Sequence, residues 1–228
     1  MYQRILAVLT LASAAVLGTD GLPLIARHLV TGPSSQVEMA NTGTRAITAW
    51  SLGITTHPEE GKIHRVIHTG DAYLAEVTRD LPRSSPHLDW LPPGQSRVLP
   101  LDPQPADATV AVMAVVLDDG TALGEPKILE EIFAKRIAER DALHTVVDTF
   151  NAVLPAKRGA AAVDELKTRF AALPQSGEST PIRSAREAVD AFAQKAASNA
   201  DEADHSLRTY AAFVQRQYDV AAKHAVRK

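Results

Sequence analysis

The densest group of potential metal ligands lies in one short segment of the chain, where histidines and glutamates cluster: His57, Glu59, Glu60, His64 and His68. Imidazole and carboxylate groups suit zinc and copper, so this segment is a candidate metal site. Val66 and Ile67 favour a strand, however, and four strand residues separate His64 from His68 by about 13 Å, too far for one ion. We retain His57, His64 and His68 as candidate ligands. The simpler expectation is that these three histidines face solvent on a strand or in a loop.

Other polar residues have simpler explanations than catalysis. Asp118 and Asp119 precede Gly120 in a predicted turn, and Glu130 with Glu131 occupies the favourable first turn of a predicted helix. The sequence contains no G-x-S-x-G, HExxH, G-x-x-x-x-G-K or G-x-G-x-x-G motif. We therefore predict no catalytic residue and no cofactor. A hydrolase-like enzyme whose groups converge only in the fold stays an alternative.

Composition predicts a folded protein and argues against nucleic acid as a partner. The chain has 228 residues, of which 45% are hydrophobic and 22% charged, enough to bury a substantial core. Its formal net charge is −3 and its pI is about 6.2, so there is no overall basic field to neutralise phosphates. The absence of cysteine excludes disulfides, thiolate zinc sites and a cysteine nucleophile.

The N-terminus is typical of a secretory signal peptide. Arg4 makes the first residues positive, and the uncharged run 5–17 follows it. This run is shorter than the roughly 20 residues of a membrane-spanning helix, so no stable transmembrane span is predicted after signal removal. We predict a signal peptide over residues 1–18, with cleavage after Ala14 or Gly18, and a periplasmic or extracellular location.

The segment after the signal, residues 19–125, predicts a β-sandwich. Strands are expected over residues 35–40, 45–55, 63–68, 95–101 and 109–117. Asn41-Thr42-Gly43-Thr44 predicts a hairpin between the first two, and Asp118-Asp119-Gly120 predicts another. Trp50 is expected to anchor the core on one face of its strand, with Ile47 on the other face. Gly70-Asp71 is expected to break the third strand, and Asp71 to cap a short helical turn over residues 72–81.

Residues 126–228 predict a region of about four α-helices. Apolar residues recur three or four apart over 127–154, which predicts one helix roughly 42 Å long. Further helices are predicted over 160–173, from Thr180 onward, and over 201–225. The run 109–117 is apolar at nearly every position and should be buried on both faces. We expect the long helix to dock on the sandwich and cover this run.

Aromatic residues in the helical region permit two interpretations: Phe150, Phe170, Phe192, Tyr210, Phe213 and Tyr218. They could line an apolar ligand cleft between helices. Most of them lie on or beside the stripes that packing of three or four helices requires, so we expect them to form core.

The first part of the chain resembles bacterial immunoglobulin-like or fibronectin type III-like β-sandwich modules. The matching features are the run Val37 to Gly43, the strand with Trp50, the Leu91-Pro92-Pro93-Gly94-Gln95-Ser96 approach to a strand, and the turn at Asp118. The resemblance covers roughly residues 35–125. It implies an Ig-like sandwich within an α+β fold, and the role of a spacer, adhesion unit or carrier in an exported protein.

Together these patterns predict an exported, non-catalytic binding or scaffolding protein of the cell envelope. Its partner is expected to be another envelope or extracellular protein. Besides the enzyme alternative, a metal or small-ligand carrier using the segment His57 to His68 stays open.

Overall fold

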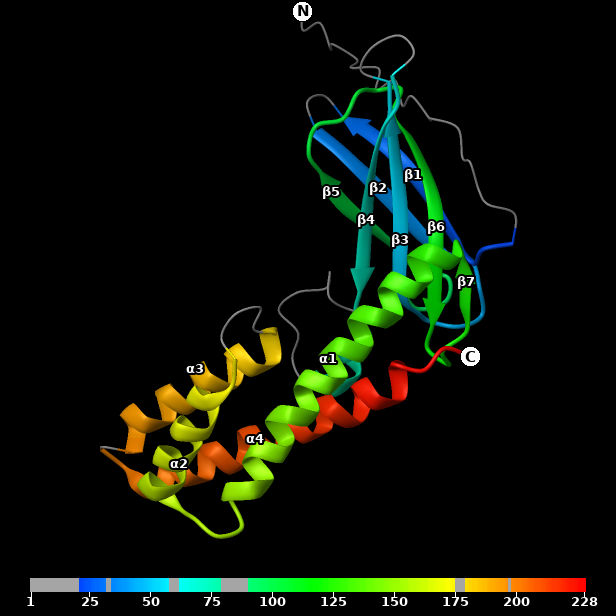
Figure 1. The fold of residues 1–228 in the computed structure, drawn as a ribbon. Coiled ribbons are helices and arrows are strands. Elements are labelled where there is room, and N and C mark those ends of the chain that lie inside the picture. Colours follow the sequence, from blue (N-terminus) through cyan, green and yellow to red (C-terminus); the bar gives the residue numbers. More distant parts are fainter. Residues whose placement is uncertain (1–20, 32–33, 58–61, 79–89, 175–178, 197) are drawn as a thin grey trace, which may run out of the picture. The chain divides into compact units, whose positions relative to one another are not determined.

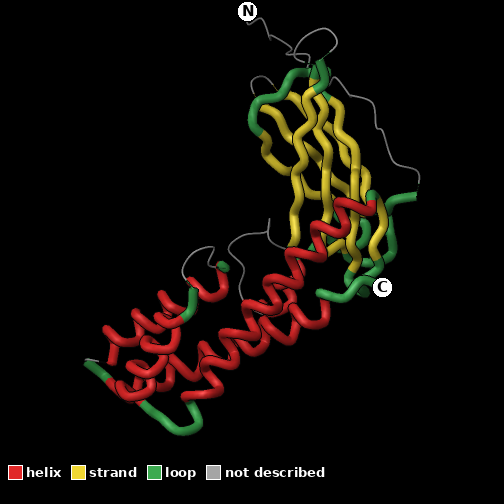
Figure 2. Tube along the Cα trace, viewed as in Figure 1, coloured by secondary structure: helices red, strands yellow, loops and turns green. Residues whose placement is uncertain are grey.

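The computed structural model describes residues 21–228, apart from 32–33, 58–61, 79–89, 175–178 and 197. The predicted signal peptide, residues 1–18, therefore lies outside the described residues, as do Glu59 and Glu60. The described chain is an α+β protein, with two antiparallel sheets followed by helices (Figures 1 and 2).

Seven strands form the two sheets within the described residues. They are β1 (Leu24–Thr31), β2 (Ser34–Asn41), β3 (Ile47–Thr56), β4 (His64–Asp71), β5 (Ser96–Leu101), β6 (Thr109–Leu117) and β7 (Ala122–Gly124). One sheet has the order β1-β2-β5 and the other β4-β3-β6-β7. A single apolar core unites them, because Val37 and Met39 of the first sheet belong to the same buried cluster as Leu52 and Val115 of the second.

The predicted hairpin between residues 35–40 and 45–55 is wrong. β2 pairs with β1 and β5, whereas β3 pairs with β4 and β6, so the turn carries the chain from one sheet to the other. Buried Asn41 holds this crossing: its side-chain amide donates to the carbonyls of Arg45 and Leu91, each at 2.8 Å, and its Oδ1 accepts from the Gly43 amide at 2.9 Å. The chain bends here, but neither Gly43 nor its neighbours have the positive φ that the predicted hairpin turn would use.

The strand β1 was not predicted from the sequence. Its buried positions include Leu24, Ala26 and His28, and a histidine interrupts the apolar alternation that marks a strand. His28 is satisfied internally, with Nε2 at 2.6 Å from the Ser35 hydroxyl and Nδ1 at 3.2 Å from the Ala108 carbonyl. Its burial is therefore structural.

Trp50 packs against the strand core, as expected, but remains partly exposed. The pairing of β3 with β6 has a register shift on each side of Trp50. Ile47 and Leu52, which were predicted to lie on opposite faces, both belong to the buried core of the sheets as a result. Gly70 lies directly opposite Trp50. A Cβ at Gly70 would stand 2.5 Å from the indole ring, so the packing of Trp50 requires glycine here. The strand continues to Asp71, so the predicted break at Gly70-Asp71 is wrong.

The predicted hairpin at Asp118-Asp119-Gly120 is confirmed by the pairing of β6 with β7. Gly120 has a φ of 89°, and the amide of Leu117 bonds to the carbonyl of Thr121 at 2.9 Å. Burial of Val112 to Leu117 confirms that neither face of β6 is open to solvent there. That the long helix covers it stays a prediction.

The helical part begins with a short 3-10 helix, where a helical turn was expected, and continues in four α-helices within the described residues. They are η1 (Tyr73–Thr78), α1 (Pro126–Val153), α2 (Gly159–Ala172), α3 (Thr180–Ala196) and α4 (Ala200–His224). The four predicted α-helices are confirmed to within a residue or two at the ends that were predicted. One position of the apolar pattern over residues 127–154 differs in direction: Ile137, which this pattern predicts to face inward, is 39% exposed, while Arg136 is completely buried.

The chain divides into two compact units, each with its own apolar core. The strand unit contains the two sheets and continues to Glu130, and the helical unit contains η1 and the chain from Glu131 to Arg227. The helical core gathers residues from η1 and all four α-helices, among them Tyr73, Val146, Leu166, Val189 and Leu207. Across the residues that the structure describes, every helix lacks the length of apolar sequence needed to cross a membrane.

Candidate functional site

The candidate metal ligands lie on or beside the edge of a sheet. His57 directly follows β3 and is exposed, while His64 and His68 lie in β4, opposite Thr56 and Leu52 respectively. The predicted strand is confirmed, so about 13 Å separates the two positions along its axis. Among the described residues no group of three or more histidine or acidic side chains could hold a metal ion. The metal-carrier alternative stays a prediction.

The acidic pair at the β6–β7 turn has the structural role that its sequence predicted. Asp119 accepts a hydrogen bond from the Thr121 amide at 2.9 Å, and this bond is the main cause that lowers the Asp119 pKa. Asp118 forms an ion pair with Arg45 at 2.9 Å. Both carboxylates therefore hold the turn in place.

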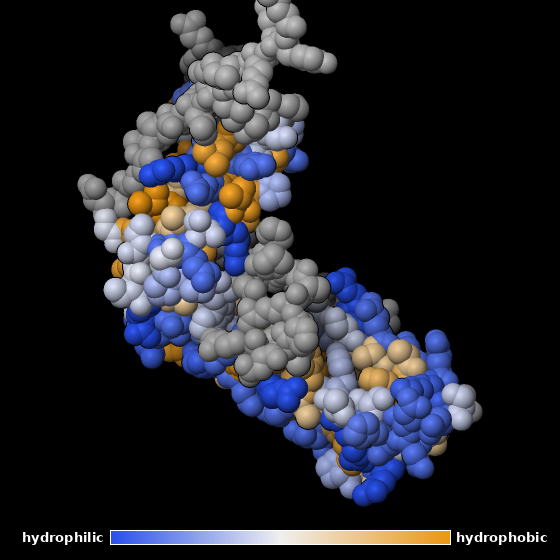
Figure 3. Space-filling model, turned by 180° about the vertical axis from the view of Figure 1, so that it is seen from behind, coloured by the Kyte–Doolittle hydropathy of each residue, from blue (hydrophilic) through white to orange (hydrophobic). Residues whose placement is uncertain are grey.

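The end strand β4 exposes an unusual amount of aliphatic surface for a sheet edge. Ile63, just before it, is 72% exposed, Ile67 is 48% exposed and Val66 is 37% exposed. Val66 lies opposite Ile54 and Ile67 opposite Gly53, so the two side chains project from opposite faces of the sheet. The space-filling view of Figure 3 also shows apolar patches among polar surface on the strand unit.

Among the described residues, one side of the β4 backbone pairs with no other strand. The amide of Ala72 bonds to the carbonyl of Thr48 at 2.8 Å and continues the β3–β4 register by one pair. Hydrogen-bonded and non-hydrogen-bonded pairs alternate in an antiparallel ladder. The even-numbered residues of β4 therefore direct their backbone groups to β3. Arg65, Ile67 and Thr69 direct theirs away from it, where the described sheet ends.

The aromatic residues of the helical unit mainly form core. Phe150 and Phe170 are buried, and Phe192, Tyr210 and Tyr218 pack against the same cluster while partly exposed. Phe150 makes edge-to-face contacts with Phe170 and Tyr210, at ring-centroid separations of 5.6 and 6.0 Å. These contacts support the core interpretation over an aromatic-lined cleft.

A network of polar groups lies inside the helical unit, and the sequence did not predict it. Completely buried Arg136 stacks over the Tyr73 ring at 4.9 Å and donates to the carbonyl of His224 at 3.2 Å. The Tyr73 hydroxyl donates to Glu139 at 2.7 Å. Glu76 of η1 accepts from His224 at 2.9 Å. The network thereby joins η1 to α1 and α4.

Burial and hydrogen bonding shift two pKa values in this network. Burial, together with the nearby positive charges of Arg136 and Lys223, lowers the pKa of His224 from its ordinary value of 6.5, although the Glu76 carboxylate acts to raise it. Burial alone would raise the pKa of Glu76, but hydrogen bonds from Lys223 and His224 outweigh it and hold the pKa below 4.5. Because Glu76 is then ionised and accepts only, Nε2 of neutral His224 carries the proton of their bond.

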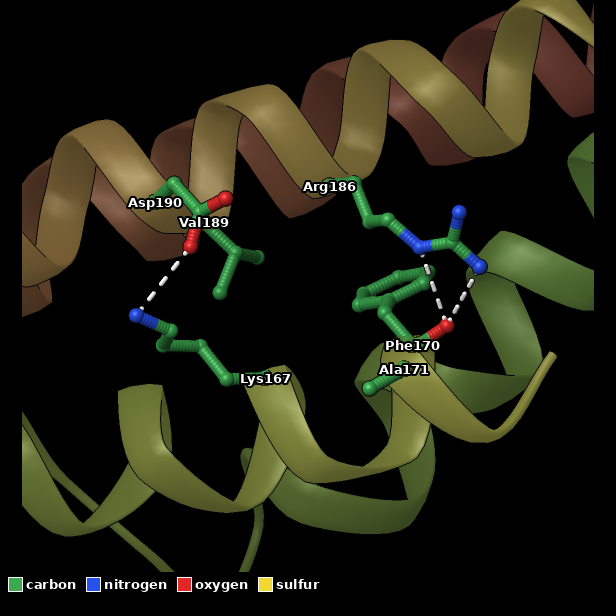
Figure 4. Close-up of a pocket in the computed structure, with 6 residues that line it drawn as sticks. All are labelled: Lys167, Phe170, Ala171, Arg186, Val189 and Asp190. Atoms are coloured by element: carbon green, nitrogen blue, oxygen red, sulfur yellow. Dashed lines mark hydrogen bonds and ion pairs between the residues drawn. The ribbon is translucent and has the colours of Figure 1, made fainter. Parts of the chain in front are cut away.

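A small cavity opens between α2 and α3, as Figure 4 shows. Its volume is about 140 Å³, and its lining combines apolar and charged side chains: Lys167, Phe170, Ala171, Arg186, Val189 and Asp190. The helical spacing of three or four residues places Lys167 beside Phe170 and Ala171 on α2, and Arg186 beside Val189 and Asp190 on α3. Such a lining suits a small ligand with an apolar body and one polar end.

The two cations of this cavity have different environments. Arg186 donates to the Phe170 carbonyl at 3.0 and 2.7 Å and to the Leu173 carbonyl at 3.1 Å, so it caps the C-terminal end of α2. Lys167 instead forms an ion pair across the helices with Asp190 at 3.2 Å, and both side chains are about half exposed. In the sequence these residues resemble an ordinary solvated helix face, which is why the cavity was not predicted.

Comparison of the chain with protein-family models, with curated proteins and with solved structures returned no match.

Proposed function

We propose that the protein is an exported, non-catalytic binding or scaffolding protein of the cell envelope, whose paired sheets act as an Ig-like carrier module. The observation that carries the proposal is the aliphatic edge strand β4, with Ile63, Val66 and Ile67 exposed. Sheet edges are usually protected from other chains by charges, proline, bulges or short length. β4 has eight residues and contains no proline, and its two charged residues, Arg65 and Asp71, lie near its ends, so its middle is long enough to accept another strand.

The mode of binding that fits this edge is strand addition. An extended segment of a partner would hydrogen-bond to the outward backbone groups of Arg65, Ile67 and Thr69, and its side chains would contact Ile67 on one face and Val66 on the other. Arg65 is exposed between the histidines, which favours a segment that carries acidic residues. The partner class is another envelope or extracellular protein.

A pull-down from the envelope fraction tests the proposal with the full mature chain as bait. Ile67→Lys places a charge on the edge while leaving its backbone intact, and we expect it to remove the captured partner. Val226→Lys makes the same kind of change at a valine that is 57% exposed in the helical unit, and we expect it to retain the partner. Equal capture by both variants would place binding elsewhere. Fractionation that finds the full-length protein in the cytoplasm would contradict export.

One observation favours the enzyme alternative. Glu139, which accepts the Tyr73 hydroxyl bond at 2.7 Å, also lines a cavity of about 100 Å³ together with Thr180, Ser184 and Tyr210. A carboxylate beside hydroxyl groups is a possible base for hydrolysis. Activity toward p-nitrophenyl esters that Glu139→Gln abolishes, without a change in circular dichroism, would favour this alternative over the binding proposal.

A further inference from the structure

The cavity between α2 and α3 has a different character at each end, and Figure 4 shows both. At one end Lys167 of α2 reaches toward Asp190 of α3, and at the other Arg186 of α3 holds the Phe170 carbonyl. Between these two cross-helix contacts lie the Phe170 ring and the Val189 side chain, which are both 1% exposed. The floor of the cavity is therefore apolar and its ends are polar.

Cavity volume limits the size of the ligand. A dry apolar cavity of about 150 Å³ is large enough to accept benzene. The hollow of about 140 Å³ between α2 and α3 has a similar volume, but it is open to solvent on one side, so it covers only part of a ligand of this size. Ala171 is exposed at its border, so a ligand can enter from solvent without opening the helical core.

The ion pair at the border indicates the charge of the ligand. Lys167 already binds a carboxylate at this place, that of Asp190, and the pair is about half exposed on both sides. Exchange of one carboxylate for another keeps the charge of Lys167 compensated, and it releases Asp190 to solvent at little cost. Arg186 is committed to the α2 carbonyls, so one cation is available for exchange, which suits a monoanion better than a phosphate dianion.

We propose that this cavity binds a short monocarboxylic acid, with its apolar body over exposed Ala171 and the aliphatic chain of Lys167, and its carboxylate on the Lys167 ammonium group. The site is independent of the strand-addition surface on β4, because it lies entirely within the helical unit. Either proposal can therefore fail while the other holds.

Three probes of nearly the same shape separate the contributions of charge and fit. Benzoate, benzamide and benzamidine are a monoanion, a neutral molecule and a cation on the same ring. Each is titrated into the full mature chain while the amide shifts of Phe170, Ala171 and Val189 are followed by NMR. We expect benzoate to saturate these shifts with a Kd on the order of 1 mM, and benzamide to bind about fivefold more weakly, as expected for a half-exposed ion pair.

Matched variants locate the binding. Ala171→Leu extends into the cavity border and should abolish benzoate binding, whereas Ala172→Leu, at the next exposed residue of α2 outside the lining, should leave it unchanged. Lys167→Met should reduce the benzoate affinity to that of benzamide. The proposal is overturned if benzoate does not saturate these shifts, if all three probes bind equally, or if Ala171→Leu and Ala172→Leu behave alike.

Discussion

Phe150 offers the most direct test of the helical core. It is 1% exposed and contacts the rings of Phe170 and Tyr210 at interplanar angles of 65° and 76°. Edge-to-face pairs contribute about 0.5–1.5 kcal/mol each beyond the burial of their area, so loss of two costs about 1–3 kcal/mol. Phe150→Leu preserves most of the apolar volume, and repacking adds less than about 1.5 kcal/mol. We expect a total loss of roughly 2–4 kcal/mol.

A double-mutant cycle isolates the ring contact from the change in volume. Urea unfolding followed by circular dichroism at 222 nm gives the free energies for Phe150→Leu, Tyr210→Leu and the double variant. We expect a coupling of about 0.5–1.5 kcal/mol. Phe213→Leu is the matched control, because Phe213 lies on the same helix as Tyr210 but over Arg216, outside the helical core cluster. A coupling for Tyr210 no larger than that for Phe213 would refute the proposed ring contact.

Three further predictions concern the polar network, the strand unit and the sheet crossing. The lowered pKa values of His224 and Glu76 mean that the unfolded chain binds more protons, so stability should fall as pH drops below 6.5 and again below 4.5. Glu76→Gln should flatten the lower-pH loss in unfolding measured from pH 7 to 3, and an unchanged slope would contradict this role. Gly70→Val should force its side chain into Trp50 and shift the tryptophan fluorescence, with a cost of about 1–3 kcal/mol; native-like spectra and stability would refute the close packing. Asn41→Ala should leave buried backbone groups unpaired at a cost of about 2–4 kcal/mol in thermal unfolding, and a loss under about 0.5 kcal/mol would show that water replaces the amide.

The helices could be predicted from the sequence because their signal is local. Apolar residues three or four apart share a face whatever the rest of the chain does, and α1 to α4 follow this pattern closely. Arg136 and Ile137 show the limit of the rule. Arg136 is accepted in the interior because the Tyr73 ring and the His224 carbonyl, distant in sequence, satisfy its guanidinium.

The sheet order could not be predicted in the same way. Alternation identifies a strand and its faces, but it does not encode which strand lies beside it. The turn residues around Asn41 are compatible with a hairpin and also with a crossing between sheets, and only the distant Leu91 carbonyl distinguishes the two. The cavity lined by Lys167 and Asp190 could not be predicted from the sequence either. Both residues resemble an exposed helix surface, and only the packing of α2 against α3 brings them together.

The inclusion of η1 in the helical unit sets an order for folding during synthesis. The strand core needs residues only up to Glu130, so it can form while much of the chain is still on the ribosome. The helical unit cannot be completed then, because Glu76 hydrogen-bonds to Lys223 and His224, which are synthesised nearly 150 positions later. The two units should therefore mature in sequence, and a chain released early would keep its sheets while leaving Tyr73 and Glu76 without their α-helical contacts.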